Sequence, residues 1–293
     1  MNARLQMVTA MVIYGTISLF VRNIPLSSAE VALFRAVIAL AALLIFKRLR
    51  GKRLNIQAMG GDLPLLALSG AAMGFNWIFL FEAYRYTTVS VATLSYYFAP
   101  VLVMLACPVL FHERFTRLQA ACFAGATLGL CLVISPGGIG ADGTHLKGVA
   151  FGLAAAVLYA SVVLVNKRIA RVSGLDRTLW QFAAAALVLA PYVLFTTGIH
   201  LEGMTPPGWA SLLTVGVIHS GVAYVLYFSS LSRLPGQESA ILSYIDPLVA
   251  VVVSVAVFAE PASLQQILGG ALILACTLLN ELAGNVGAAS SES

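Results

Sequence analysis

The chain has 293 residues, of which 60% are hydrophobic and 10% are charged, against about 25% charged in an average soluble domain. A water-soluble core cannot conceal that much apolar surface, so the composition excludes an ordinary soluble protein and indicates one that uses lipid as its solvent. The net charge of +5 does not indicate nucleic-acid binding, because the 17 Lys and Arg residues are scattered over short loops.

Ten apolar runs follow one another between breaks of Gly, Pro and charge, and each is long enough to cross a bilayer as a helix. The fold class is therefore predicted to be all-α integral membrane, with ten transmembrane helices. Residues 285–293 are expected to form a flexible C-terminal tail. The predicted spans are 5–21, 29–47, 63–85, 89–111, 117–134, 146–168, 177–198, 208–231, 237–259 and 263–283.

The fourth span and its flanks recur in the ninth. Residues 81–113 can be laid over residues 228–260, which pairs Tyr97 with Tyr244, Pro100 with Pro247 and Glu113 with Glu260. The match indicates one membrane unit used twice, as in many secondary transporters. We expect residues 1–138 to form the first five-helix repeat and residues 139–284 the second. Because five is odd, the second repeat is inverted, and both belong to one membrane domain.

Positive charge predicts the orientation. With a cytoplasmic N-terminus, thirteen of the 17 basic residues lie inside, while Arg22, Arg85 and Lys147 lie outside and Arg35 falls within a span. Cytoplasmic loops carry such an excess of Lys and Arg. We therefore expect a multi-pass protein of the cell inner (plasma) membrane with both termini cytoplasmic, Glu113 at the inner face and Glu260 at the outer face.

Several loose apolar motifs resemble those of the drug/metabolite transporter superfamily, specifically its EamA-type ten-helix branch. They are FRAVIA at Phe34–Ala39, AYRYTTVSVATLSYYFAPV at Ala83–Val101, HER at His112–Arg114, and weaker copies around Ser239–Pro247 and Glu260. The resemblance covers nearly the whole chain. It implies inverted five-helix repeats and the export or exchange of amino acids, sugars, nucleotide precursors or drugs. The second copy departs from the first at Asp246, which replaces Ala99, and at Pro261, which replaces Arg114.

Asp246 lies near the middle of the ninth span, where a carboxylate costs about 2.5–3.5 kcal/mol unless it faces protein or water. It is interpreted as a proton-titrating or ammonium-binding group in a transport cavity, or else as a protonated carboxyl bonded to a neighbouring helix. Pro247 follows it and is expected to free a carbonyl one turn earlier. Pro100 and Pro247 are candidate flex points. His219 has a comparable depth in the eighth span and either couples to Asp246 or packs in the core.

Arg35 and Glu82 are predicted to share the outer layer of the membrane, where a salt bridge between them is expected. The alternative is that Arg35 is partly free to hold a solute carboxylate, which its planar guanidinium does well.

Aromatic and polar side chains in the interior of the spans, away from the lipid headgroups, predict a solute-binding cavity for a planar or partly apolar molecule. Amino acids, aromatic ones in particular, are the leading cargo. Ordinary core packing is the alternative at about half of these positions. The candidates are Tyr14, Asn76, Trp77, Tyr97, Tyr159, His219, Tyr224, Tyr244 and Asp246.

The competing class is an intramembrane enzyme that uses Asp246 and His219. It is disfavoured because Asp246 is the sole Asp deep in a predicted span, and no metal-binding His cluster or phosphate-binding Gly loop is present. Rings of like charge, which a channel would need, are also missing from the sequence. We predict no catalytic residue, metal or cofactor. The predicted partners are a small-molecule solute and membrane lipid, with no nucleic acid and no motif for a protein partner. Nucleosides, sugars and drugs remain alternative solutes.

Overall fold

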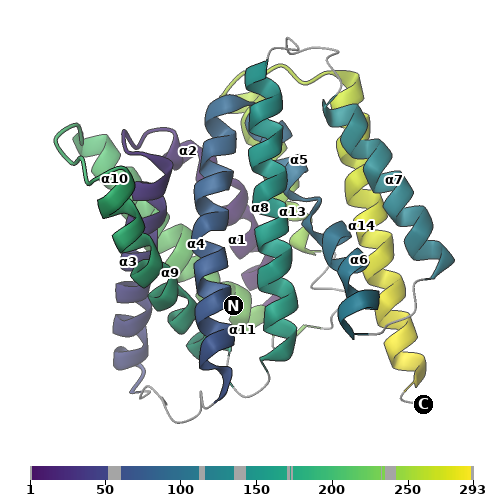
Figure 1. The fold of residues 1–293 in the computed structure, drawn as a ribbon, viewed down its shortest axis with the longest axis horizontal. Helices are drawn as coiled ribbons and strands as arrows, with labels where there is room; N and C mark the ends of the chain where they lie inside the picture. The colour runs from purple at the N-terminus through teal and green to yellow at the C-terminus, as the bar shows by residue number, and fades with distance from the viewer. Residues whose placement is uncertain are drawn as a thin grey trace.

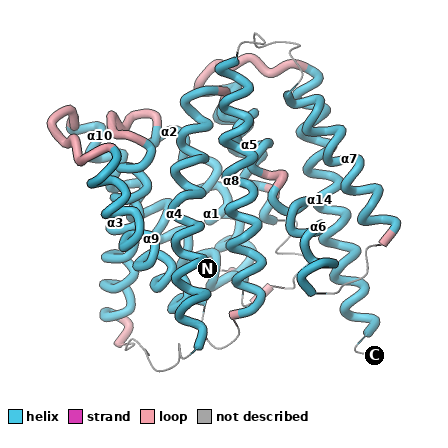
Figure 2. Tube along the Cα trace, in the orientation of Figure 1, coloured by secondary structure: helices cyan, strands magenta, loops and turns pink. Residues whose placement is uncertain are grey.

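The structure is a computed structural model that describes residues 2–51, 61–111, 116–134, 143–169, 172, 174–231, 233–234 and 242–291. Within these ranges every regular element is a helix, and the helices run roughly side by side (Figure 2). The motif at His112–Arg114 and the first residues of the predicted span 237–259 lie outside the described residues.

The first half of the chain forms five membrane crossings, two of which are interrupted. In chain order they are α1 (Ala3–Gly15) with α2 (Ile17–Val21), α3 (Ser28–Leu49), α4 (Leu63–Tyr86), α5 (Val89–Tyr96) with α6 (Ala99–Phe111), and α7 (Arg117–Ile134).

The second half forms five more crossings, two of which contain π-helical stretches. They are α8 (Gly143–Arg168), α9 (Gly174–Thr196), α10 (Pro206–Thr214) with η2 (Val215–Val222) and α11 (Ala223–Leu231), α13 (Ile245–Val252) with η3 (Val253–Val257), and α14 (Leu264–Ser291). Within the described ranges, 6 helices are long and apolar enough to cross a membrane, and four shorter apolar helices complete the set. The prediction of an all-α membrane protein with ten spans is confirmed.

The last helix is longer than expected. α14 continues to Ser291, so the backbone of residues 285–291 is helical, and the flexibility of the tail 285–293 stays a prediction. The segment contains Ala288 and Ala289 and no proline, which is compatible with a helix that is already formed.

Several helices begin where a side chain satisfies the first free backbone N–H groups. Ser27 and Glu30 form a reciprocal capping box at the start of α3. Thr88 caps α5, and Thr205 caps α10. Each such cap is worth about 1 kcal/mol. These caps fix the ends of three helices at one end of the bundle, beside the pocket described below.

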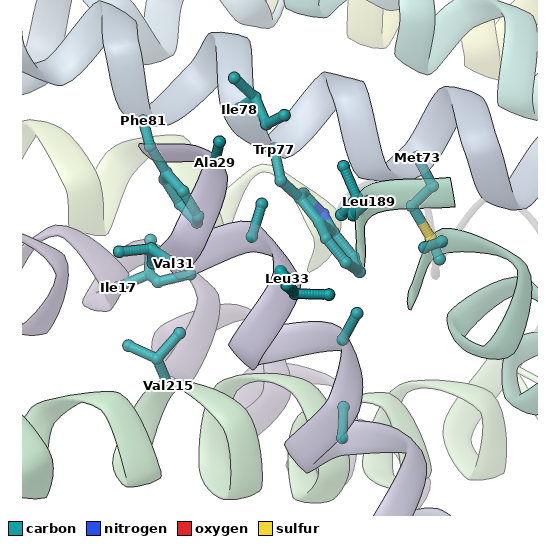
Figure 3. Close-up of a cluster of buried hydrophobic side chains, with 14 of the residues drawn as sticks. Ile17, Ala29, Val31, Leu33, Met73, Trp77, Ile78, Phe81, Leu189 and Val215 are labelled. Atoms are coloured by element: carbon teal, nitrogen blue, oxygen red, sulfur yellow. The ribbon is translucent and has the colours of Figure 1, made fainter. Parts of the chain in front are cut away.

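The largest buried cluster joins α3, α4 and α9. Figure 3 shows Trp77 and Phe81 pointing from α4 toward α3, which lies between α4 and the helix that carries Val215. Helices in lipid associate through close van der Waals packing and not through a hydrophobic driving force. The opposite faces remain apolar and exposed, as at Phe195, which is 90% exposed. This pattern fits a bundle surrounded by hydrocarbon.

The fifth helices of the two halves, α7 and α14, lie side by side and antiparallel (Figure 1). A Cβ atom added at Gly129 would lie 2.6 Å from the carbonyl oxygen of Gly269, and one at Gly125 would meet the sulfur of Cys276. The numbering therefore rises along one helix as it falls along the other. An inverted second copy requires this arrangement.

The close contact between α7 and α14 predicts that one added methyl group destabilises the protein. We expect Gly129→Ala to cost about 1–3 kcal/mol, because the new carbon would collide with the backbone of α14. Gly143→Ala is the matched control, since nothing lies within 4 Å of a Cβ there. Thermal unfolding of the purified protein in detergent measures the difference, and equal melting temperatures for the two variants would contradict it.

Candidate solute-binding site

Asp246 lies in the first turn of α13, and its Oδ2 accepts a hydrogen bond of 2.7 Å from the hydroxyl of Tyr97. Tyr97 is the C-cap of α5, in the first half of the chain. The bond therefore joins the two halves. Tyr97 and its repeat mate Tyr244 occupy equivalent interruptions, because Tyr244 is the N-cap of α13. Both halves thus contribute a helix break to the same region.

The two prolines follow these breaks directly. Pro100 lies in the first turn of α6, and Pro247 lies in the first turn of α13. The first N–H groups of a helix have no intrahelical partner, so a proline there removes no helical hydrogen bond. The helices are interrupted before the prolines. That Pro247 frees a carbonyl one turn earlier, and that both prolines are flex points, stay predictions.

Further tyrosine rings lie near this bond. Tyr96 lies 5.9 Å from Tyr97 and 5.4 Å from Tyr159 of α8, measured between ring centroids. Tyr14 of α1 makes an edge contact with Tyr224 of α11 at 5.6 Å. Tyr14, Tyr96 and Tyr224 are partly buried and lie at or next to the ends of α1, α5 and α11, where the helices are interrupted.

Close packing at Gly15 brings the end of α1 against the backbone of Asp246. A Cβ atom at Gly15 would lie 2.6 Å from the carbonyl oxygen of Asp246, so α1 and α13 touch there. α1 ends at Gly15, and the hydroxyl of Thr16 donates to the carbonyl of Ile13 at 2.8 Å. The break in α1 therefore lies at the level of the break before α13.

Arg35 of α3 is buried with 4% of its surface exposed. Its Nε donates to the hydroxyl of Ser220 in η2 at 2.7 Å. Its guanidinium carbon lies 4.4 Å from the ring centroid of Trp77 and 5.8 Å from that of Phe81. A desolvated cation on an aromatic face gains about 2 kcal/mol.

The predicted salt bridge between Arg35 and Glu82 is wrong. Glu82 pairs with Arg85 at 3.1 Å, one turn further along α4. In the described part of the chain, no carboxylate is paired with Arg35. Trp77 and Phe81 are four residues apart and share the face of α4 that meets α3, whereas the next position is turned by about 100°.

His219 is 2% exposed and lies in η2 next to Ser220. Its Nε2 is 3.3 Å from the hydroxyl oxygen of Thr16, and its Nδ1 is 3.3 Å from the carbonyl oxygen of Thr214. The structure thus places His219 against the break between α1 and α2, and it does not bring His219 and Asp246 into contact. π-Helical turns are frequent at functional sites, and this one turns both His219 and Ser220 inward.

The other predicted residues divide between the site and the helix interfaces. Asn76 is 2% exposed and donates to the carbonyl of Ala155 at 2.6 Å, which places it in the α4–α8 interface. Trp77 supports Arg35. Tyr244 is 9% exposed. Tyr159 is 40% exposed, and its ring contacts the ring of Tyr96.

Sequence reasoning missed Tyr84, Tyr96 and Ser220. Tyr84 and Tyr96 belong to the tyrosine-rich stretch at Ala83–Val101, which was singled out as a motif and not as a source of site residues. Both lie within electrostatic range of Asp246. Ser220 carries no signal except its position beside His219.

A pocket of about 710 Å³ opens at the end of the bundle where α2 ends and α3 begins. Arg22, Glu30 and Arg85 supply its charged lining, and Phe81 and Tyr84 also line it. Phe81, whose ring centroid is 5.8 Å from the guanidinium carbon of Arg35, lines this pocket, so the pocket extends toward Arg35.

Glu260 connects three segments at the same end. It forms an ion pair with Arg22, accepts the backbone N–H of Val89 at 2.8 Å and accepts the hydroxyl of Ser254. Ala259 precedes it with a φ of 52°, which is an unfavourable conformation for a residue with a side chain. The strained backbone therefore aims the carboxylate at these donors.

The fold and the site define a multi-pass, all-α membrane protein whose halves meet at a carboxylate and a set of tyrosines. No cluster of three or more potential metal ligands occurs in the described ranges. The EamA-like transporter family model matches residues 1–135 and 146–281. The chain belongs to the EamA-like transporter family, which confirms the resemblance noted in the sequence.

Curated relatives carry transporter names. The "Uncharacterized transporter YxxF" of Bacillus subtilis (strain 168) is 28% identical and covers 94% of this chain and 88% of its own length. The "Aromatic amino acid exporter YddG" of Ancylobacter novellus is 28% identical over 72% of this chain and 70% of its own. The "Probable terminal-alkyne amino-acid exporter" of Streptantibioticus cattleyicolor is 29% identical over 86% and 83%.

A solved crystal structure matches the fold with a TM-score of 0.65, 21% sequence identity and 96% coverage of both chains. At this identity the likeness shows the fold alone.

The pairing of Glu82 with Arg85 predicts that removing the charge of Glu82 has a small effect on stability. We expect Glu82→Gln to change the free energy of unfolding by less than about 1 kcal/mol, because the exposed pair with Arg85 is worth little. Asp176→Asn is the contrast. It leaves Lys47, whose side chain is 5% exposed, without its partner, and should cost about 1–3 kcal/mol. Thermal unfolding in detergent measures the loss of stability in both variants. A loss for Glu82→Gln as large as the expected loss for Asp176→Asn would contradict its exposed pairing with Arg85.

Proposed function

We propose that this protein is a secondary transporter that exports or exchanges amino acids, with aromatic amino acids as the leading cargo. The observation that carries the proposal is the hydrogen bond from Tyr97 to Asp246, which joins the two halves among tyrosine rings. The carboxylate offers a partner to a solute ammonium group. The rings of Tyr14, Tyr96 and Tyr224 offer apolar faces to a planar side chain.

Alternating access is the proposed mechanism. The first copy, residues 1–138, rocks against the second copy, residues 139–284, and exposes the site to each side in turn. Two features support this. The family model matches two separate stretches of the chain, and the helix breaks before Pro100 and Pro247 provide non-helical backbone where the copies meet.

The names of two relatives support the choice of cargo, since YddG is called an aromatic amino acid exporter and the Streptantibioticus protein a probable terminal-alkyne amino-acid exporter. The cargo of this chain is inferred from these names together with its own site. An aromatic amino acid carries an acid, an amine and an aromatic ring. These groups match the guanidinium, the carboxylate and the tyrosines of this region, respectively.

The proposed transporter lies in the cell inner membrane with both termini cytoplasmic, because positive residues are concentrated on that side. A green fluorescent protein fused after residue 293 should fluoresce in intact cells. Alkaline phosphatase fused after Gly203, in the α9–α10 connection, should be active. The opposite pair of results would contradict the proposed orientation.

Counterflow in liposomes that contain only this protein tests the function. Vesicles preloaded with unlabelled phenylalanine should accumulate labelled phenylalanine, whereas protein-free vesicles should not. Uridine, glucose and a cationic dye, tested in the same way, represent the other solute classes. Formation of a chemical product without movement of solute would favour an intramembrane enzyme.

Asp246→Asn should reduce this counterflow by at least about 10-fold, because a neutral amide replaces a charge-assisted partner of the ammonium group. Glu202→Gln is the matched control, since Glu202 lies in an exposed loop. Equal counterflow rates for the Asp246 variant and the control would show that Asp246 does not bind the solute.

A further inference from the structure

We infer that Arg35 holds the carboxylate of the transported solute, so that the cargo is a zwitterion bound between Arg35 and Asp246. This inference rests on the proposed function, because it assigns the second charged end of the same solute. It makes a carboxylate, and not only an amine or an aromatic ring, a requirement for binding.

The charge of Arg35 is incompletely compensated in the described structure. An arginine side chain stays protonated and carries five N–H donors. Ser220 accepts the one on Nε, and Trp77 covers one face of the guanidinium. In the described part of the chain the four donors on Nη1 and Nη2 have no acceptor. An arginine at membrane depth costs about 2.5–3.5 kcal/mol on insertion scales, which makes an anionic partner favourable.

Other basic residues of the bundle are already engaged. Lys47 pairs with Asp176, and Arg22 pairs with Glu260. Arg177 donates to the carbonyls of Ile169 and Val172 in the α8–α9 connection. Arg35 differs from Lys47 and Arg22, because its one hydrogen bond in the described structure goes to a neutral hydroxyl and not to a carboxylate, and from Arg177, because neither of its terminal nitrogens has an acceptor there.

The orientation of the guanidinium suits a carboxylate. Ser220 is itself fixed, because its hydroxyl donates to the carbonyl of Val215 at 3.0 Å within η2. Ser220 and Trp77 therefore hold Arg35 from its Nε edge and from one face. The end that carries Nη1 and Nη2 remains, and its two parallel N–H groups match the two oxygens of a carboxylate.

A run of aromatic contacts connects Arg35 with Asp246. Trp77, which lies under Arg35, is 5.4 Å from Phe182, and Phe182 is 5.2 Å from Tyr224, measured between ring centroids. Tyr224 in turn contacts Tyr14 at 5.6 Å, and Gly15, the next residue, packs against the backbone of Asp246. Asp246 is hydrogen-bonded to Tyr97 and is not paired with Arg35. The two opposite charges therefore stay separate beside one aromatic surface, where a zwitterion has a partner for each end.

The experiment compares three ligands that differ in one group each, measured by thermal shift or calorimetry on the purified full-length protein. Phenylalanine carries both charges, phenethylamine lacks the carboxylate, and 3-phenylpropionate lacks the ammonium group. The variants are Arg35→Gln, Arg35→Lys and, as a control, Arg48→Gln, which removes an exposed guanidinium in the last turn of the same helix, α3. The melting temperature without ligand reports whether each variant is folded.

The wild-type protein should bind phenylalanine about 10- to 100-fold more tightly than phenethylamine, which is the effect of one charge-assisted pair. Arg35→Gln should abolish this preference. Arg35→Lys should keep part of it, because the charge remains but the paired donors do not. Arg48→Gln should behave as wild type.

An unchanged preference for phenylalanine over phenethylamine in a folded Arg35→Gln protein would overturn the inference. If that variant does not fold, the wild-type protein decides: equal affinity for the two ligands would also overturn it. Counterflow separates this inference from the proposed function. If phenylalanine moves equally well without Arg35, the result contradicts only the inference. If 3-phenylpropionate binds in a way that requires Arg35 but phenylalanine does not move, the result contradicts only the proposed cargo.

Discussion

The hydrogen bond between Tyr97 and Asp246 is the interaction on which the arrangement of the site depends. It connects the end of α5 in the first half with the start of α13 in the second, at two equivalent interruptions. A carboxylate at this depth gains from such a donor, because it has left bulk water and the surrounding hydrocarbon offers none. The bond also explains why tyrosine rings collect there, since an aromatic ring with a hydroxyl can pack against helices and still reach a polar partner.

A second constraint comes from the π-helix η2. A π-helical turn widens the helix and displaces the following side chains, which brings His219 and Ser220 to the inner face of α10–α11. His219 then meets the break after α1, and Ser220 meets Arg35 of α3. The irregular backbone thus organises the polar groups of the second half, as the breaks at Thr16 and Tyr97 do in the first.

Hydrophobic length alone was sufficient to place all ten membrane crossings, because a bilayer admits few structures besides helices. The helix breaks and π-helical turns could not be predicted in the same way, since they depend on contacts between helices. Arg35 illustrates the difference. Depth suggested Glu82 as its partner, but the rotation of α4 turns Trp77 and Phe81 toward it instead. The tyrosine-rich stretch was recognised, yet Tyr84 and Tyr96 became site residues only when the helices were seen together.

Glu260 has a consequence for motion. One carboxylate binds the end of α2 through Arg22, the start of α5 through Val89 and η3 through Ser254. Separating any one of these segments from the others leaves a charged oxygen short of a donor, so partial separation gains nothing. Glu260 therefore holds the three segments together at this end of the bundle, and a movement that separates α2 or α5 from η3 must supply this carboxylate with a replacement donor.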